Sequence, residues 1–173
     1  RLELPPGRYQ IHVGAHEASG NTIGTVPYDV EIPDYAKSPS ELSGVALTSS
    51  SADLFVTSNP DPLLKDALPA APIATRIFSQ AETLTTYSEL YVAAGAARAL
   101  TMMTSVQDAR SGKTVFQNED RRAVDASTRP TTHGFSTQVP LKNLSAGTYI
   151  LRVSIQSSIA VNATERIVPF EVR

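Results

Sequence analysis

The chain ends with nearly the same pattern with which it begins. Residues 4–13 read Leu-Pro-Pro-Gly-Arg-Tyr-Gln-Ile-His-Val, and residues 144–153 read Leu-Ser-Ala-Gly-Thr-Tyr-Ile-Leu-Arg-Val. In the same way, residues 26–30 (Val-Pro-Tyr-Asp-Val) are matched by residues 168–172 (Val-Pro-Phe-Glu-Val). The first match is offset by 140 positions and the second by 142, which predicts two hairpins that differ only in loop length. An internal repeat implies that one structural unit occurs twice, so it constrains the architecture before any other feature does.

Apolar and polar residues alternate in both copies. The first copy has its alternating apolar residues at Tyr9, Ile11, Val13, Tyr28, Val30 and Ile32, which we call the hairpin face. The second copy has them at Tyr149, Leu151, Val153, Val168, Phe170 and Val172. A period of two with one apolar face is typical of half-buried antiparallel strands. Because a lone two-stranded hairpin is only marginally stable in water, we expect the hairpin face to be buried. It could pack on an upstream domain, on the sandwich that follows, or on another subunit.

Both copies share the pattern Leu-x-x-Gly-x-Tyr. The tyrosines are Tyr9 and Tyr149, and the glycines are Gly7 and Gly147. A tyrosine at the start of the penultimate strand of an immunoglobulin-like sandwich forms a tyrosine corner, in which its hydroxyl bonds back to nearby backbone. We predict this role for both tyrosines, with each glycine providing the turn into the strand.

Short runs with strand character follow one another from residue 73 onward. We predict strands at 75–79, 82–93, 99–109, 113–119, 134–140, 147–156 and 164–172. The stretch 93–100 and the polar stretch 120–132 are predicted loops. Charged residues make up only 18% of the chain, which favours β-structure over helical bundles. Regular short strands separated by turn signals are typical of an antiparallel sandwich.

The predicted fold class is therefore all-β: an antiparallel immunoglobulin-like β-sandwich, preceded by the closing hairpin of a second β-domain. We assign residues 1–36 to that hairpin and residues 73–173 to the sandwich. Residues 37–72 are predicted to be a proline-rich linker with short strands at 44–47 and 54–56. Because Arg1 lies just before a domain's last strands, we expect the chain to be a piece of a longer protein.

Composition argues against several function classes. The chain has no cysteine, so disulfides, zinc–thiolate sites and thiol nucleophiles are impossible. A net charge of −2 and a pI near 5.9 argue against a nucleic-acid partner. No apolar run reaches the roughly 18 residues that a membrane-spanning helix needs.

No motif indicates catalysis or a cofactor. His12 and His16 are four residues apart, which on a strand is about 13 Å, too far to share a metal, and His133 has no visible partner. Residues 111–114 (Ser-Gly-Lys-Thr) imitate the end of a phosphate-binding loop, but Gln107 stands where the motif needs glycine. We therefore expect no cofactor and a protein that is not an enzyme.

Acidic residues recur near the predicted linker. Asp34, Asp53 and Asp61 are the best candidates for a calcium site at a domain junction, because calcium takes carboxylate and carbonyl oxygens. None has the spacing of a known calcium loop, so we favour solvated turn residues and predict no metal site.

The residues also resemble those of a known family. Residues 4–13, residues 26–39 (Val-Pro-Tyr-Asp-Val-Glu-Ile-Pro-Asp-Tyr-Ala-Lys-Ser-Pro) and residues 42–47 (Leu-Ser-Gly-Val-Ala-Leu) carry this resemblance. The segment Thr75–Tyr91 and the closing hairpin fit the same region. The chain resembles the C-terminal immunoglobulin-like region of bacterial, acidobacterial-type von Willebrand factor A-related proteins. The resemblance implies an A-type domain upstream with an Asp-x-Ser-x-Ser metal-ion adhesion motif. Residues 49–53 (Ser-Ser-Ser-Ala-Asp) have the wrong order for that motif, so no metal ligand is carried over.

The resemblance implies a secreted or periplasmic protein used for binding or assembly. We expect a non-catalytic extracytoplasmic module that serves as a spacer or protein-binding domain, with a protein partner or self-association. The alternative is a structural subunit of a larger assembly or filament, in which the N-terminal hairpin docks in trans. A third hypothesis is that the chain is an accessory domain of a secreted hydrolase.

Overall fold

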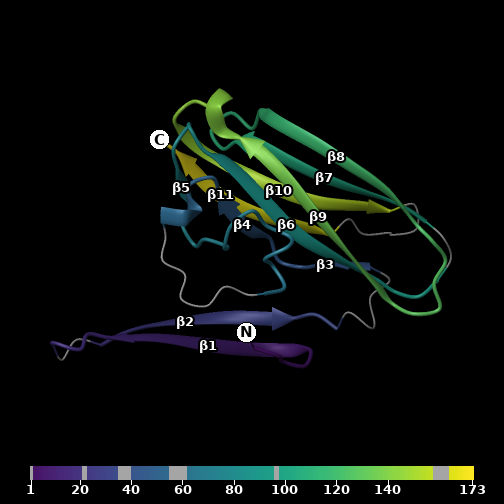
Figure 1. The fold of residues 1–173 in the computed structure, drawn as a ribbon, viewed down its shortest axis with the longest axis horizontal. Coiled ribbons are helices and arrows are strands. Elements are labelled where there is room, and N and C mark those ends of the chain that lie inside the picture. The colour runs from purple at the N-terminus through teal and green to yellow at the C-terminus, as the bar shows by residue number, and fades with distance from the viewer. Residues whose placement is uncertain (1, 21–22, 35–39, 55–61, 96–97, 158–163) are drawn as a thin grey trace. The chain divides into compact units, whose positions relative to one another are not determined.

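The computed structural model describes residues 2–20, 23–34, 40–54, 62–95, 98–157 and 164–173. It is nearly all β, with 61% strand and 4% helix. The chain divides into two compact units, residues 1–37 and residues 38–173 (Figure 1). The predicted fold class, an all-β immunoglobulin-like sandwich preceded by a hairpin, is confirmed.

The first unit is a two-stranded antiparallel hairpin. It consists of β1 (Gly7–His16) and β2 (Ile23–Ile32), which pair over their full length. Tyr9 lies opposite Val30, and Ile11 lies opposite Tyr28. Directly opposite residues of an antiparallel pair point to the same side of the sheet, so the six residues of the hairpin face share one side.

The second unit is a sandwich of two sheets. The five-stranded sheet has the order β5 (Ile77–Phe78), β11 (Glu165–Val172), β10 (Gly147–Ser157), β7 (Arg98–Asp108) and β8 (Thr114–Val124). The other sheet consists of β3 (Ser40–Leu42), β4 (Ala46–Ser49), β6 (Thr83–Val92) and β9 (Thr131–Pro140). Among the described strands, all pairings are antiparallel except the short parallel pair of β5 with β11. The described residues of this unit also form two 3₁₀ turns, η1 (Ala52–Leu54) and η2 (Leu141–Asn143).

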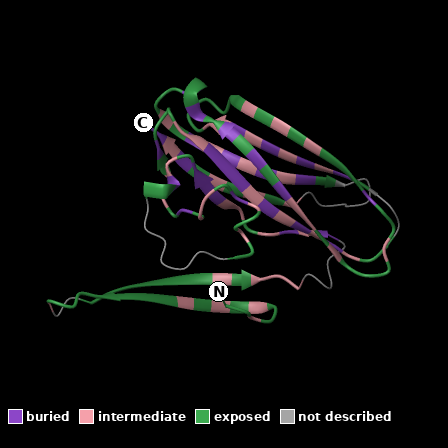
Figure 2. Cartoon of the chain, viewed as in Figure 1, coloured by how far each residue is buried: buried purple, intermediate pink, exposed green. Residues whose placement is uncertain are grey.

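The core lies between the two sheets. Buried and less buried residues alternate along β6, β9 and β11, so buried bands cross the strands of the sandwich (Figure 2). The fully buried large side chains are Leu42, Leu47, Leu84, Leu90, Val92, Leu100, Met102, Val106, Val139, Leu141, Leu151 and Ile155. Three aromatic rings add to them: Tyr149 stacks on Phe170 at 5.7 Å between centroids, and Phe78 meets Phe170 edge-on at 6.1 Å.

Two arginines connect the sheets at their edges. Arg122 on β8 donates to the carbonyl of Gly134 on β9 at 2.9 Å, and its guanidinium lies 4.3 Å from the centroid of the Phe135 ring. Arg166 on β11 bonds the carbonyl of Ser43 and the carboxylate of Glu41, each at 3.1 Å. Charged side chains at sheet edges disfavour pairing with strands of other chains.

The structure of residues 37–72 differs from the predicted proline-rich linker. Residues 40–54 belong to the sandwich, because β3 and β4 both pair with β6. The segment also places Leu42, Leu47 and Ala52 in the core. The boundary between the two units falls after residue 37 rather than after residue 72. Leu54 ends the 3₁₀ turn η1 instead of starting a strand, and residues 55–56 lie outside the described residues.

The predicted loop at 120–132 is also wrong over most of its length. Strand β8 continues to Val124, and β9 begins at Thr131. The residues of this stretch are polar because β8 is the edge of its sheet, where charged side chains are common. Arg121 pairs with Glu119 and Arg122 pairs with Asp120 along the same strand.

The two hairpins have identical pairing registers. Gly7 lies opposite Ile32, and Gly147 lies opposite Val172, so both strands of the repeat are offset by 140 positions. The Val-Pro motif, with its offset of 142, is therefore shifted by two residues along the second strand relative to the pairing register. The predicted difference in loop length is wrong. A slide of two residues keeps every side chain on its own face, which explains why the sequence pattern did not reveal it.

Candidate functional site

Both repeats carry a tyrosine with the same hydrogen bond. The hydroxyl of Tyr149 donates to the carbonyl of Ser145 at 2.8 Å, and the hydroxyl of Tyr9 donates to the carbonyl of Pro5 at 2.8 Å. These are the backbone contacts of a tyrosine corner. Burial raises the pKa of Tyr149, and the nearby charge of Asp108 raises it further.

The glycine of each repeat lies beside its tyrosine ring. A methyl group at Gly7 would lie 3.5 Å from the Tyr9 ring, and one at Gly147 would lie 3.9 Å from the Tyr149 ring. Both distances are ordinary van der Waals contacts. Space alone therefore does not require glycine at these positions.

The two copies differ in what covers their apolar face. Val153 is 2% exposed and Phe170 is 2% exposed, because the four-stranded sheet packs over them. In the hairpin, Val13 is 62% exposed and Tyr28 is 68% exposed. Figure 2 shows the strands of the hairpin mostly in green and those of the sandwich banded with purple. Within its own unit, the hairpin face is thus the equivalent surface without a second sheet over it, and it is our first candidate site.

A second candidate lies on the outer face of the four-stranded sheet. Tyr87, Glu89 and Tyr91 alternate along β6, and both hydroxyls donate to the Glu89 carboxylate, at 3.1 Å from Tyr87 and 2.8 Å from Tyr91. Burial raises the pKa of Tyr87, and the hydrogen bond and charge of Glu89 raise it further. The Tyr87 ring lies across Gly134, where a methyl group would come within 2.6 Å of its hydroxyl oxygen.

A shallow cleft adjoins this tyrosine row. Its volume is about 200 Å³, and Tyr87 and Glu89 form one of its walls. Ser43, Gly44, Ala46, Leu63 and Leu64 form the rest of its lining. Aromatic rings beside a carboxylate are suited to recognition. The alternation Tyr-x-Glu-x-Tyr within the predicted strand 82–93 is the sequence signal for this row, which is not among the residues predicted above.

A third cluster joins the end of β4 to the start of β6. The hydroxyl of Ser51 donates to one oxygen of the Glu82 carboxylate, and the backbone N–H of Ser79 donates to the other at 2.7 Å. Burial raises the pKa of Glu82, but the hydrogen bonds from Ser51, Ser79 and Ser49 outweigh it and lower the pKa overall. A cleft of about 340 Å³ lies alongside, lined in part by Ser49 and Asp53. The contacts of Glu82 are those of a structural tie between two turns.

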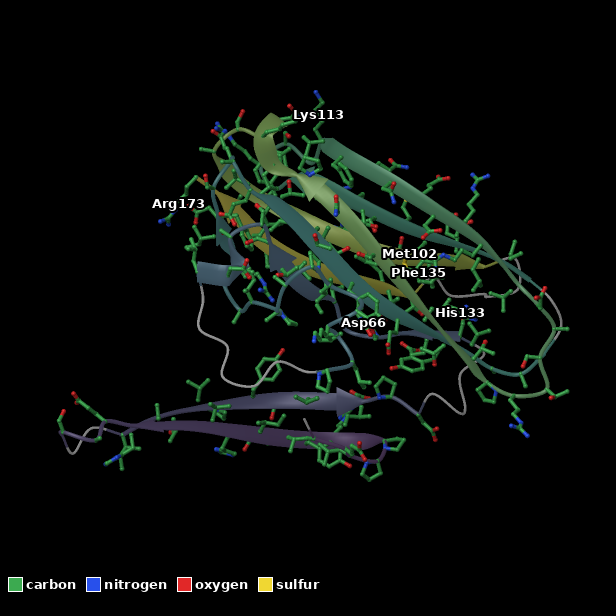
Figure 3. All side chains as sticks on the ribbon, in the orientation of Figure 1. Asp66, Met102, Lys113, His133, Phe135 and Arg173 are labelled. Carbon is green, nitrogen blue, oxygen red and sulfur yellow. The ribbon has the colours of Figure 1, made fainter. Side chains whose placement is uncertain are left out.

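The histidines do not come together. His12 lies on β1 and contacts the side chain of Gln10 at 2.8 Å, and His16 ends the same strand. His133 lies on β9 near Phe135 and contacts the hydroxyl of Thr131 at 2.9 Å (Figure 3). Among the residues that the structure describes, no three histidine or carboxylate side chains are grouped to hold a metal ion.

The Ser-Gly-Lys-Thr segment belongs to the turn between β7 and β8. The Asp108 carboxylate accepts the N–H groups of Arg110 and Ser111 at 3.0 and 2.6 Å, and Gly112 adopts a φ of +71°. Hydrogen bonds from Ser111 lower the pKa of Asp108. Figure 3 shows Lys113 at the outer end of this turn. Because a strand and not a helix follows this turn, the segment lacks the helix N-terminus that a phosphate-binding loop needs.

The acidic residues near the predicted linker fall in separate parts of the chain. Asp34 follows β2 in the first unit, Asp53 lies in η1 of the second unit, and Asp61 lies outside the described residues. In the described part of the chain, no helix is long and apolar enough to cross a membrane.

Comparisons with known proteins bear on the fold alone. No protein-family model and no curated protein matches the chain. Among solved structures, the C-terminal domain of Wzt is similar over 80% of this chain and 75% of its own length, with a TM-score of 0.53 and 8% identity. At that identity the likeness shows a shared sandwich fold.

Two β-glucosidases are also similar in part. One is an enzyme of saponin metabolism from intestinal bacteria, with a TM-score of 0.44 and 11% identity, and the other is from Listeria innocua, with a TM-score of 0.40 and 15% identity. The chain spans only 16% of each enzyme's length. At these TM-scores the two likenesses carry no functional argument.

Proposed function

We propose that the chain is a non-catalytic immunoglobulin-like module that serves as a spacer or protein-binding domain in a larger extracytoplasmic protein. The observation that carries this proposal is the duplicated closing hairpin. Two copies with the same register stand in one chain, and only residues 33–39 separate the first copy from the first strand of the sandwich. Domain boundaries typically fall in short, exposed linkers that few contacts cross and that are often rich in proline and polar residues.

The sequence resemblance to von Willebrand factor A-related proteins supports an extracytoplasmic parent protein. In this proposal the parent carries its ligand-binding domain elsewhere, and the module sets the distance between that domain and its anchor. The row of Tyr87, Glu89 and Tyr91 is the surface of the module best suited to contact a protein partner, because tyrosine is enriched in protein interfaces.

A second candidate function rests on the exposed hairpin face. Exposed apolar patches mark interaction sites, and an unpaired strand edge invites a partner strand. In this alternative the chain is a structural subunit of an assembly, and the hairpin of one copy docks on another copy in trans.

Light scattering across a dilution series distinguishes these two functions. We expect residues 1–173 to remain monomeric from micromolar to near-millimolar concentration. A mass that rises with concentration, and that returns to the monomer value when residues 1–35 are deleted, would reject the spacer proposal in favour of assembly in trans. Fractionation of cells that express the natural gene tests the location separately, and recovery in the cytoplasm would contradict it.

A further inference from the structure

We propose that β1 and β2 are the last two strands of a second complete sandwich, whose other strands precede them in the same polypeptide. In this arrangement the hairpin face is covered by the four-stranded sheet of that upstream domain. The inference deepens the proposed spacer function and rests on it, since it makes the module one of at least two domains in tandem.

The first argument is the equivalence of the two hairpins. Every paired position of β1 and β2 that has a counterpart in β10 and β11 is offset by 140 positions in both strands. The tyrosine hydrogen bond is the same, with Tyr9 reaching four residues back to Pro5 and Tyr149 four residues back to Ser145. Shared register and a shared corner indicate one structural unit used twice.

The second argument is that each uncovered surface of the hairpin has a covered counterpart. Ile11 and Val13 correspond to Leu151 and Val153, which are 0% and 2% exposed in the sandwich core. The second edge of β10 pairs with β7 from Tyr149 to Ser157. The corresponding edge of β1 has no partner strand within the described residues of its own unit. Within the described residues of its own unit, the hairpin therefore has neither a facing sheet nor a strand paired to this edge of β1.

The third argument is the polarity of the opposite side. Arg8 and Glu31 form an ion pair at 3.5 Å, and the Gln10 amide donates to Asp29 at 3.0 Å. In the sandwich, the corresponding side is the outer face, where Arg152 pairs with Glu165 at 3.0 Å. A sheet with one polar and one apolar face is typical of antiparallel sheets that cover a core on one side only.

A second copy of this chain is a poor occupant for the hairpin face. The inner side of its four-stranded sheet carries Leu84 and Leu90, and both are 0% exposed beneath the copy's own five-stranded sheet. A second copy would have to release its own closing strands, β10 and β11, before its four-stranded sheet could accept β1 and β2 of another copy. In the complete sandwich, Ser40 to Asn143, a stretch of 104 residues, precedes the closing hairpin pattern. We therefore expect a stretch of similar length, rich in strands, before residue 4.

Hydrogen exchange tests the proposal in two lengths of the protein. The first is residues 1–173, and the second is the natural polypeptide with the residues that its gene encodes before Arg1. We expect the amides of β1 and β2 to exchange at least a hundredfold more slowly in the longer protein, because packing in a core suppresses local opening. Equal exchange in the two lengths, or a gene that encodes far fewer than about 100 residues before Arg1, would overturn the proposal.

A transplant provides a second test within this chain. Because the registers are identical, residues 4–33 replace residues 144–173 one for one in the 173-residue chain. We expect this variant to unfold cooperatively, although at a lower temperature, because Phe170 is replaced by the smaller Val30 and Arg166 by Val26.

The control transplant uses residues 5–34 at the same place. That slip of one residue turns the polar side inward, so the control should show no cooperative unfolding. Equal behaviour of the two transplants would contradict the equivalence of the hairpins. This outcome is distinguishable from that of the dilution series, because the transplants test the equivalence of the hairpins and the dilution series tests the spacer function.

Discussion

Leu151 and Ile11 occupy equivalent positions in the two hairpins, and truncating each to alanine should have very different effects. Leu151 lies on β10 between two neighbouring strands, opposite Val168 on one side and Val106 on the other, and it is 0% exposed. Removing its side chain beyond Cβ leaves a cavity that the two sheets cannot close completely. Substitutions of this kind lower the free energy of unfolding by about 2–5 kcal/mol, and we expect about 3.5 kcal/mol for Leu151→Ala.

That loss is large compared with the stability of a typical domain, which is about 5–15 kcal/mol. With a urea m-value of about 2 kcal/mol per molar, the unfolding midpoint of Leu151→Ala should fall by about 1.7 M. The chain has no tryptophan, so far-UV circular dichroism is the suitable signal. Wild-type protein and both variants are titrated under the same conditions.

The matched variant is Ile11→Ala. In residues 1–173, Ile11 belongs to the separate hairpin unit, so its truncation should change the unfolding of the sandwich by less than about 0.5 kcal/mol. A midpoint shift for Ile11→Ala as large as that for Leu151→Ala would refute the division into two independent units. A loss below about 1 kcal/mol for Leu151→Ala would refute the close packing of the core around β10.

Three further substitutions test individual contacts of the sandwich. Tyr149→Phe removes the hydrogen bond to Ser145 and should lower the free energy of unfolding by about 1 kcal/mol in urea titrations, whereas Tyr9→Phe should leave the sandwich transition unchanged. The hydroxyl of Ser88 is buried with no hydrogen-bond partner among the described residues, so Ser88→Ala should raise the stability by about 1 kcal/mol and the calorimetric Tm by about 3 °C; a lower Tm would contradict this assignment. The pKa of Glu82 is lower in the folded protein, so its carboxylate contributes stability above the unfolded pKa, and this contribution is lost as the pH falls through the folded pKa. Glu82→Gln should therefore lower stability by about 1 kcal/mol at pH 7, after allowance for solvent screening, and reduce the loss of stability between pH 7 and pH 3; parallel pH profiles for wild type and variant would refute this role.

The sequence by itself determined the local features of this protein. The alternation of apolar residues in residues 7–16 and 147–157 predicts strands because neighbouring side chains of a strand point to opposite faces. The duplicated pattern around Tyr9 and Tyr149 indicated a repeated hairpin, and the low charge and regular turn signals favoured a sandwich. All these signals act between residues that are close in the chain, so a single sequence is enough to detect them.

The tertiary structure decided the features that depend on distant residues. Residues 40–54 join the sandwich because β3 and β4 pair with β6, which lies 35 to 52 positions further along the chain. The two-residue slide of the Val-Pro motif became visible only from the paired strands, since an even slide leaves the face pattern unchanged. The row of Tyr87, Glu89 and Tyr91 became a candidate surface only when the sheet turned its even-numbered neighbours, Ser88 and Leu90, into the core. Which face of a strand is buried depends on the sheet that packs against it, and that contact lies between residues far apart in the sequence.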